Sequence, residues 1–132
     1  MIFGTVSTPS DKRIKKNIVK IDHLKNEKIL MQIELYNFEY VSTYSADNRT
    51  QMGVIAQQAI GVDSNLAGAE VKIATDKEDI MLLTVRYDYL AIKAIAQVQY
   101  LTQRTIALED SNKLLQQKIL EFEARFKLLE KG

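Results

Sequence analysis

The sequence predicts a mixed α+β fold, in which a small head of helices and short strands is followed by a long C-terminal helix that forms a parallel trimeric coiled coil. Three observations predict it. No glycine or proline occurs between residues 85 and 131, and apolar residues recur there every seven positions. Upstream, short runs of alternating apolar and polar residues are typical of strands.

The 132 residues suit one domain with an appendage. We divide them into a linker over residues 1–9, a head over 10–84 and a coiled-coil helix over 85–132. The chain has no cysteine, which excludes disulfides, thiolate metal sites and cysteine nucleophiles. We expect no metal, cofactor, signal peptide or membrane span, because no apolar run approaches the roughly 20 residues that a span needs.

The head has four recognisable segments. Ile14, Ile18 and Ile21 stand at helical spacing and predict a basic helix over residues 11–21, with Ser10 as its N-cap. Alternation over residues 29–41 predicts two short strands or one strand with a bulge. Residues 51–60 read as a strand that turns into a short helix, and residues 61–83 as a projecting arm with a strand near residue 72.

The C-terminal helix shows a heptad repeat that lasts for more than five heptads. The residues at a are Ala91, Val98, Thr105, Asn112, Ile119 and Phe126, and those at d are Ala94, Leu101, Leu108, Leu115, Phe122 and Leu129. We expect the interface between chains to run through these positions from Val98 to Leu129. A helix packed only on its own domain would follow a 3.6-residue stripe instead, which drifts by about 20° per heptad.

Charges beside the repeat favour a parallel arrangement. Basic residues at g are followed five positions later by acidic residues at e, as in Lys118 with Glu123 and Arg125 with Glu130, and Arg104 with Glu109 follows the same rule. Each exposed pair adds under about 1 kcal/mol, so its value lies in register. Asn112 at a is typical of dimers, whereas Phe122 and Phe126 need a wider core, so these residues leave two or three strands open.

Three stretches, in order, resemble one known family. Residues 10–18, Ser-Asp-Lys-Arg-Ile-Lys-Lys-Asn-Ile, resemble the opening signature of the endosialidase-type intramolecular chaperones, with Ile14 in place of the usual leucine. Residues 53–57 match the family's Gly-x-Ile-Ala-Gln element, although Gln58 replaces the usual glutamate. Residues 85–90, Val-Arg-Tyr-Asp-Tyr-Leu, match its last motif before the terminal helix.

This resemblance implies a function. Members of the family stand at the C-terminus of phage tail spikes, tail fibres and neck appendages, form trimers, guide the folding of the preceding β-structure and then cut themselves off. It implies a serine–lysine dyad at Ser10 and Lys15, a cut at Ser10–Asp11, and a supporting place for Asp11, Arg13 and Asn17. It also implies action in the host cytoplasm during phage assembly, with the domain released from or absent in the mature virion.

The chemistry leaves two points open. A serine hydroxyl attacks only when a base takes its proton, and a lysine amine can serve only when it is neutral, which burial or nearby positive charge favours. Lys12, Arg13 and Lys16 surround Lys15. An acyl shift through the hydroxyl would break Pro9–Ser10, not the bond that the resemblance implies. The base could belong to the same chain or to a neighbour.

Other readings remain as alternatives. The closer one is a trimeric fibre tip without proteolysis, in which Ser10 is only a helix cap. The more distant one is a coiled-coil protein that binds nucleic acid through residues 11–28, which hold seven Lys or Arg against three acids. No base-reading motif accompanies this charge, so we expect no nucleic-acid or membrane partner. The expected partners are further copies of the chain and the upstream spike or fibre polypeptide.

Overall fold

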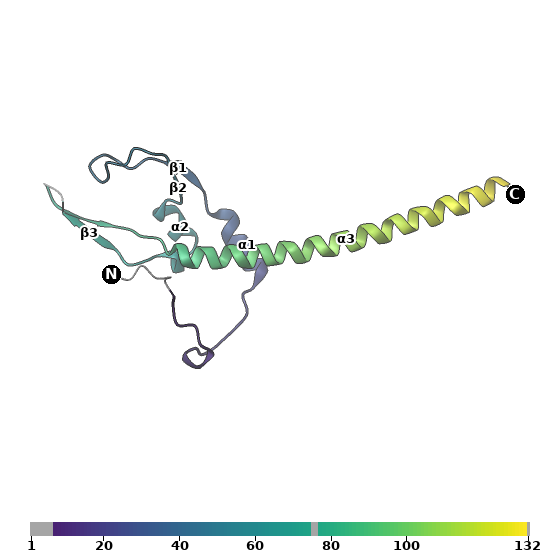
Figure 1. Ribbon diagram of the computed structural model, residues 1–132, viewed down its shortest axis with the longest axis horizontal. Helices are drawn as coiled ribbons and strands as arrows, with labels where there is room; N and C mark the ends of the chain where they lie inside the picture. Colours follow the sequence, from purple (N-terminus) through teal and green to yellow (C-terminus); the bar gives the residue numbers. More distant parts are fainter. Residues whose placement is uncertain (1–6, 75–76, 132) are drawn as a thin grey trace.

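The computed structural model describes residues 7–74 and 77–131, and it shows a small α+β head at one end of a single long helix (Figure 1). This confirms the predicted fold class of mixed head and long C-terminal helix. The elements, in chain order, are the 3-10 helix η1 (Lys12–Ile14), α1 (His23–Gln32), β1 (Tyr36–Phe38), β2 (Gln51–Gly53), α2 (Ala56–Val62), the 3-10 helix η2 (Ser64–Leu66), β3 (Val71–Ala74), β4 (Asp79–Leu82) and α3 (Tyr87–Lys131).

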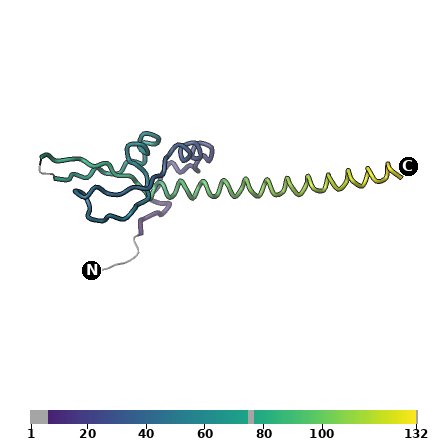
Figure 2. Tube along the Cα trace, turned by 90° about the horizontal axis from the view of Figure 1, so that it is seen from above, coloured from purple at the N-terminus to yellow at the C-terminus, as the bar shows by residue number. Residues whose placement is uncertain are grey.

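Two separate antiparallel hairpins make up the β-structure. In the first, Asn37 of β1 lies opposite Met52 of β2, and in the second, Lys72 of β3 lies opposite Met81 of β4. Both hairpins extend from the head in the direction opposite to the far end of α3 (Figures 1 and 2). The second hairpin falls within the arm predicted over residues 61–83.

A small core holds the head against the start of α3. Val54, Ala59 and Leu66 are buried together. Val54 directly follows β2, Ala59 stands in α2 and Leu66 stands in η2. Four partly buried side chains pack around them: Ile33, Val85, Tyr89 and Leu90. Because the last two stand in the first turn of α3, the core fixes the direction in which the long helix leaves the head.

Helix α1 packs along α3 through polar contacts. The amide of Asn26, 2 % exposed, donates a hydrogen bond to the Lys93 carbonyl at 2.9 Å. The His23 ring stacks on Tyr100 with centroids 5.2 Å apart. Later residues of α1 contact earlier residues of α3, so the two helices run antiparallel.

Beyond α1 the long helix stands alone. Every residue from 101 to 131 is exposed in the single chain, including the apolar ones. The 45 residues of α3 span roughly 68 Å at 1.5 Å per residue. An isolated helix buries its apolar stripe only against a partner, so this half of α3 has the surface that a coiled coil requires.

The helix predicted over residues 11–21 is wrong. Only Lys12–Ile14 forms a 3-10 turn, Asn17 takes a left-handed backbone conformation with φ of 54°, and residues 18–22 form no helix. Branched residues such as Val19 disfavour a helix here. The helix begins after Asp22 because that side chain accepts hydrogen bonds from the backbone N–H groups of residues 24 and 25.

The strands predicted over residues 29–41 are partly wrong. Ile29 to Gln32 belong to α1, and only Tyr36–Phe38 form a strand. Four alternating residues also fit the end of a helix, so the period alone could not decide. The strand and short helix predicted over residues 51–60 are confirmed as β2 and α2.

Candidate functional site

Ser10 and Lys15 lie together on the exposed segment that enters the head. The turn of η1 reverses the chain between them, and the backbone N–H of Lys15 closes that turn by bonding to the carbonyl of Lys12. The Lys15 ammonium then donates to the Ser10 hydroxyl oxygen at 2.6 Å. A lysine within direct reach of a serine hydroxyl has the geometry of a nucleophile with its base. The predicted dyad is therefore a contact, and its role in catalysis stays a prediction.

Asp11 forms an ion pair with Arg13 and not with Lys15. Its carboxylate accepts hydrogen bonds from the Arg13 guanidinium at 2.8 and 3.1 Å and from the Arg13 backbone N–H at 2.8 Å. The guanidinium, followed by the backbone N–H, lowers the pKa of Asp11 below its ordinary value. Asp11 therefore caps the turn on which Lys15 stands, with Arg13 as its anchor.

Asn17 contributes a backbone bend. Its φ of 54° lies in the left-handed region, which asparagine tolerates better than most residues other than glycine. The bend turns the chain just after Lys15 and leads into the extended run before α1. An asparagine at this position of the family signature is therefore explained by its backbone conformation, without any role for its side-chain amide.

None of the segments that the structure describes covers this site. All residues from 7 to 22 are exposed, including Ile14 at 67 %, Ile18 at 64 % and Val19 at 85 %. A nucleophile and base need a setting that limits water and favours the neutral amine. The apolar side chains beside Lys15 leave exposed surface that another chain could cover.

The second and third motifs meet in the head. A Cβ at Gly53 would stand 2.7 Å from the Tyr87 hydroxyl, so only glycine leaves room for that side chain. The same hydroxyl accepts a hydrogen bond from the backbone N–H of Val54 at 3.3 Å. These motifs therefore join β2 to the start of α3, which is a structural role.

The hydrogen bonds of Gln58 account for a glutamine where the family usually has glutamate. Its amide donates to the Gln32 carbonyl at 2.7 Å, and its carbonyl accepts from the Glu34 backbone N–H at 3.0 Å. A carboxylate can only accept, whereas an amide does both, so glutamine pins both sides of the end of α1.

A largely buried ion pair in the head was not predicted from the sequence. Lys93 and Asp63 lie 3.2 Å apart with side chains only 13 % and 9 % exposed. Burial raises the pKa of Asp63, but the backbone N–H of Asn65 and the Lys93 ammonium act against it, and the net shift is downward. Asp63 lies at the end of α2 and Lys93 lies thirty positions later in α3, so no local pattern in a single sequence predicts that they pair.

Two further properties of the described residues bear on function. Over residues 7–74 and 77–131, no three His, Asp or Glu side chains gather as metal ligands would. No helix in that part of the chain has both the length and the apolar character for crossing a membrane.

Comparison with known proteins identifies the head. Residues 10–67 match the family model Peptidase_S74, described as chaperone of endosialidase. Residues 10–67 are therefore similar to an endosialidase-type intramolecular chaperone domain. A solved structure described as a novel intramolecular chaperone aligns with this chain at a TM-score of 0.55 and 20 % sequence identity. The alignment covers 72 % of this chain and 99 % of the solved chain, so the two share a fold. No curated protein matches the chain.

The chaperone domain's signature begins at the first residue that the family model matches, Ser10. The resemblance stated from the sequence is thus confirmed, and the family is by name one of peptidases. A chaperone role implies a client polypeptide.

Proposed function

We propose that this chaperone domain trimerises through α3, guides the folding of an upstream phage tail-spike or tail-fibre polypeptide, and then cuts itself off beside Ser10. One observation carries the proposal: the 2.6 Å contact between the Lys15 amine and the Ser10 hydroxyl, at the start of the matched region. This segment joins the head to whatever precedes it, so a cut here separates chaperone from client.

Trimerisation rests on the far half of α3. Leu108, Leu115 and Phe122 are 63, 55 and 62 % exposed in the single chain, and all stand at d. Large apolar side chains at such spacing are buried when helices associate. Among the predicted basic g residues, Arg104 is an exception, because it bonds to Glu27 of its own chain at 3.3 Å. Lys118 and Arg125 have no such neighbour in α1 and remain candidates for pairing between chains.

At the Pro9–Ser10 bond, cleavage would proceed by transfer of the Pro9 acyl group to the Ser10 oxygen, followed by hydrolysis of the resulting ester. The neutral Lys15 amine takes the hydroxyl proton, and the Ser10 oxygen attacks the Pro9 carbonyl carbon. The carbon–nitrogen bond breaks, and the departing Ser10 amine receives the proton back from Lys15. Water then hydrolyses the ester and leaves a carboxylate on Pro9.

For the Ser10–Asp11 bond, which the family resemblance favours, the hydroxyl of the same residue would close a strained four-membered ring. Attack by a neighbouring chain's Ser10 or by water avoids that ring. The two bonds give products that differ by one serine, so the products distinguish these routes.

Assembly supplies what the single chain lacks. Ser10 and Lys15 are exposed, whereas three copies side by side would exclude water and crowd the basic residues of this segment. Both effects favour an uncharged amine. Cleavage would then follow trimerisation and make folding of the client effectively irreversible. We place this event in the host cytoplasm during phage assembly, with the domain absent from the finished virion.

The test uses the whole chain with a soluble marker protein fused ahead of Met1. We expect two bands on a denaturing gel, and a C-terminal fragment whose mass places its first residue at Ser10 or Asp11. Ser10→Ala and Lys15→Ala should each leave one band, whereas Lys16→Ala, a neighbouring lysine without the serine contact, should cleave normally. A single band from the unmodified chain, in a preparation shown to be trimeric, would leave the non-catalytic fibre tip as the better reading.

Co-expression of the two inactive variants locates the base. The Ser10–Lys15 contact is within one chain, so mixed assemblies of Ser10→Ala and Lys15→Ala should not cleave. Cleavage restored in the mixture would assign the base to a neighbouring chain.

A further inference from the structure

Helix α1 covers only one flank of α3. Its contacts are with Lys93 and Tyr100, which stand at c in the heptad, and with Gln97 and Arg104, which stand at g. The core positions a and d, and the opposite flank at b and e, are left uncovered over the same stretch. Two sides of α3 therefore remain free where α1 overlaps it.

Where α1 overlaps α3, the uncovered flank is apolar at both b and e, and farther along only b positions such as Ile106 and Leu120 stay apolar. Ile92 at b and Ile95 at e are 56 and 58 % exposed, whereas the e positions of later heptads hold Glu109, Glu123 and Glu130. The core residues at this level are Ala91 and Ala94. Small side chains let helix axes approach closely, which brings the flank of one chain nearer to the neighbour.

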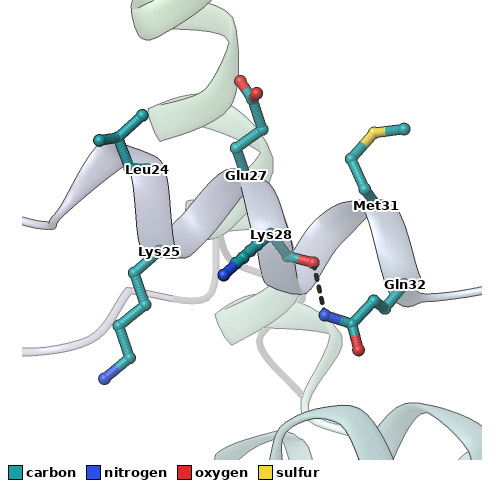
Figure 3. A pocket seen from close by; sticks show the side chains of 6 residues that line it. All are labelled: Leu24, Lys25, Glu27, Lys28, Met31 and Gln32. Atoms are coloured by element: carbon teal, nitrogen blue, oxygen red, sulfur yellow. Dashed lines mark hydrogen bonds between the residues drawn. The ribbon is translucent and has the colours of Figure 1, made fainter.

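Helix α1 carries a matching apolar edge. Leu24 and Met31 are 68 and 79 % exposed and line a shallow hollow on α1. Figure 3 shows them on the same side of the helix as Glu27, while Lys25 points the opposite way. Glu27 bonds to Gln97 and Arg104, both at g, so this edge of α1 lies beside the g flank of α3.

In a parallel coiled coil, the g flank of each helix faces the e flank of the next. We propose that Leu24 and Met31 of one chain pack on Ile92 and Ile95 of a neighbouring copy, so that each α1 clamps the next chain's α3. The clamp rests on the proposed trimer and goes beyond it, because it adds a second contact outside the coiled-coil core. The partner it fits is a second copy, since the complementary apolar flank belongs to the same chain.

The clamp also has a consequence for the candidate site. Helix α1 follows the segment that carries Ser10 and Lys15, separated from it only by the extended run before Asp22. When α1 is held between two chains, the downstream end of that run is fixed. In a single chain, the packing of α1 on its own α3 holds that end from one side, and the clamp adds a second side.

Disulfide trapping tests the clamp cleanly because the chain has no cysteine. With Met31→Cys and Ile95→Cys in one chain, mild oxidation should give disulfide-linked dimers and trimers on a non-reducing gel. The matched control pairs Ile95→Cys with Lys25→Cys, on the outer face of α1, and should stay at least tenfold less linked. Equal linking of the two pairs, or none in either, overturns the clamp.

Light scattering on the same samples separates this failure from failure of the trimer. Trimers that do not link through residues 31 and 95 would refute the clamp and leave the proposed function standing, whereas a single chain at working concentration would refute both. As a second measurement, Leu24→Ser with Met31→Ser should raise the concentration of half-dissociation about tenfold or more. Lys25→Ser should leave that concentration unchanged, and an equal rise in both would also count against the clamp.

Discussion

The two halves of α3 share one helix but differ in what surrounds them. Near the head, one face of α3 packs on the core through Tyr89 and Leu90 and on α1 through Lys93 and Tyr100. From residue 101 onward the whole helix is exposed in the single chain. The first half has its place fixed by its own chain, and in the proposed trimer the second half would be covered by other copies.

The difference separates two kinds of stability. The head's core is small, so its buried polar contacts weigh heavily in its free energy of unfolding. The far half has no such contacts, and its helix persists only if association buries its leucines and phenylalanines. Mutations in each half should therefore fail in different ways, and that difference can be measured.

The largest expected effect is at the far half. Leu115→Glu places a charge at d, which a coiled-coil core cannot bury without a partner for it. We expect the assembly to dissociate, with the association constant falling at least a hundredfold, and helical circular dichroism to drop as the unsupported half melts. Sedimentation measures the first and far-ultraviolet dichroism the second.

The neighbouring residue provides the control. Leu114 stands at c and is 53 % exposed, so Leu114→Glu makes the same chemical change outside the core positions. Its assembly should match that of the unmodified chain. Equal dissociation of the two variants would show that the heptad assignment is wrong.

A smaller effect is expected at the head. Asp63→Ala leaves the largely buried Lys93 ammonium without its carboxylate, which costs about 3 kcal/mol for such a pair. Thermal unfolding of the head should shift down by several degrees while the trimer mass stays unchanged. Asp79→Ala, which removes an exposed pair with Lys72, should cost under about 1 kcal/mol. A similar cost at both sites would contradict a special role for the buried pair.

The same pair predicts a dependence on pH. Because the pKa of Asp63 is lowered in the folded head, its contribution is complete above the ordinary value of 3.8 and is lost as the pH falls through the lowered value. The melting temperature should therefore decline below about pH 4, where aspartates begin to protonate. Asp63→Asn should flatten that decline relative to the unmodified chain, and parallel profiles would assign the decline to other carboxyls.

The smallest effect concerns the bend before α1. Asn17→Gly keeps a left-handed φ accessible and removes the amide, whereas Asn17→Val makes that conformation costly by about 1–2 kcal/mol. If Asn17 acts only through its backbone, the glycine variant should cleave like the unmodified chain and the valine variant several-fold more slowly. A slow glycine variant would instead show that the amide supports the site.

Much of the architecture could be predicted from the sequence. The long helix followed from the absence of glycine and proline and from the heptads, and the β2–α2 unit followed from a local pattern. The region around the site could not be predicted as well. Residues 11–21 have helical spacing of isoleucines, yet Asp11 and Asp22 cap two different turns and Asn17 bends the chain between them. Caps depend on individual side-chain hydrogen bonds, and the spacing of apolar residues does not predict them.

The heptad repeat, the family signature at Ser10 and the candidate dyad can be found in the sequence alone, because each depends on residues near one another in the chain. The fold of the head was needed to find which face of α3 it covers, that Arg104 pairs within its chain, and that Asp63 meets Lys93. These facts depend on how distant segments pack, and packing is set by the shape and burial of the whole head.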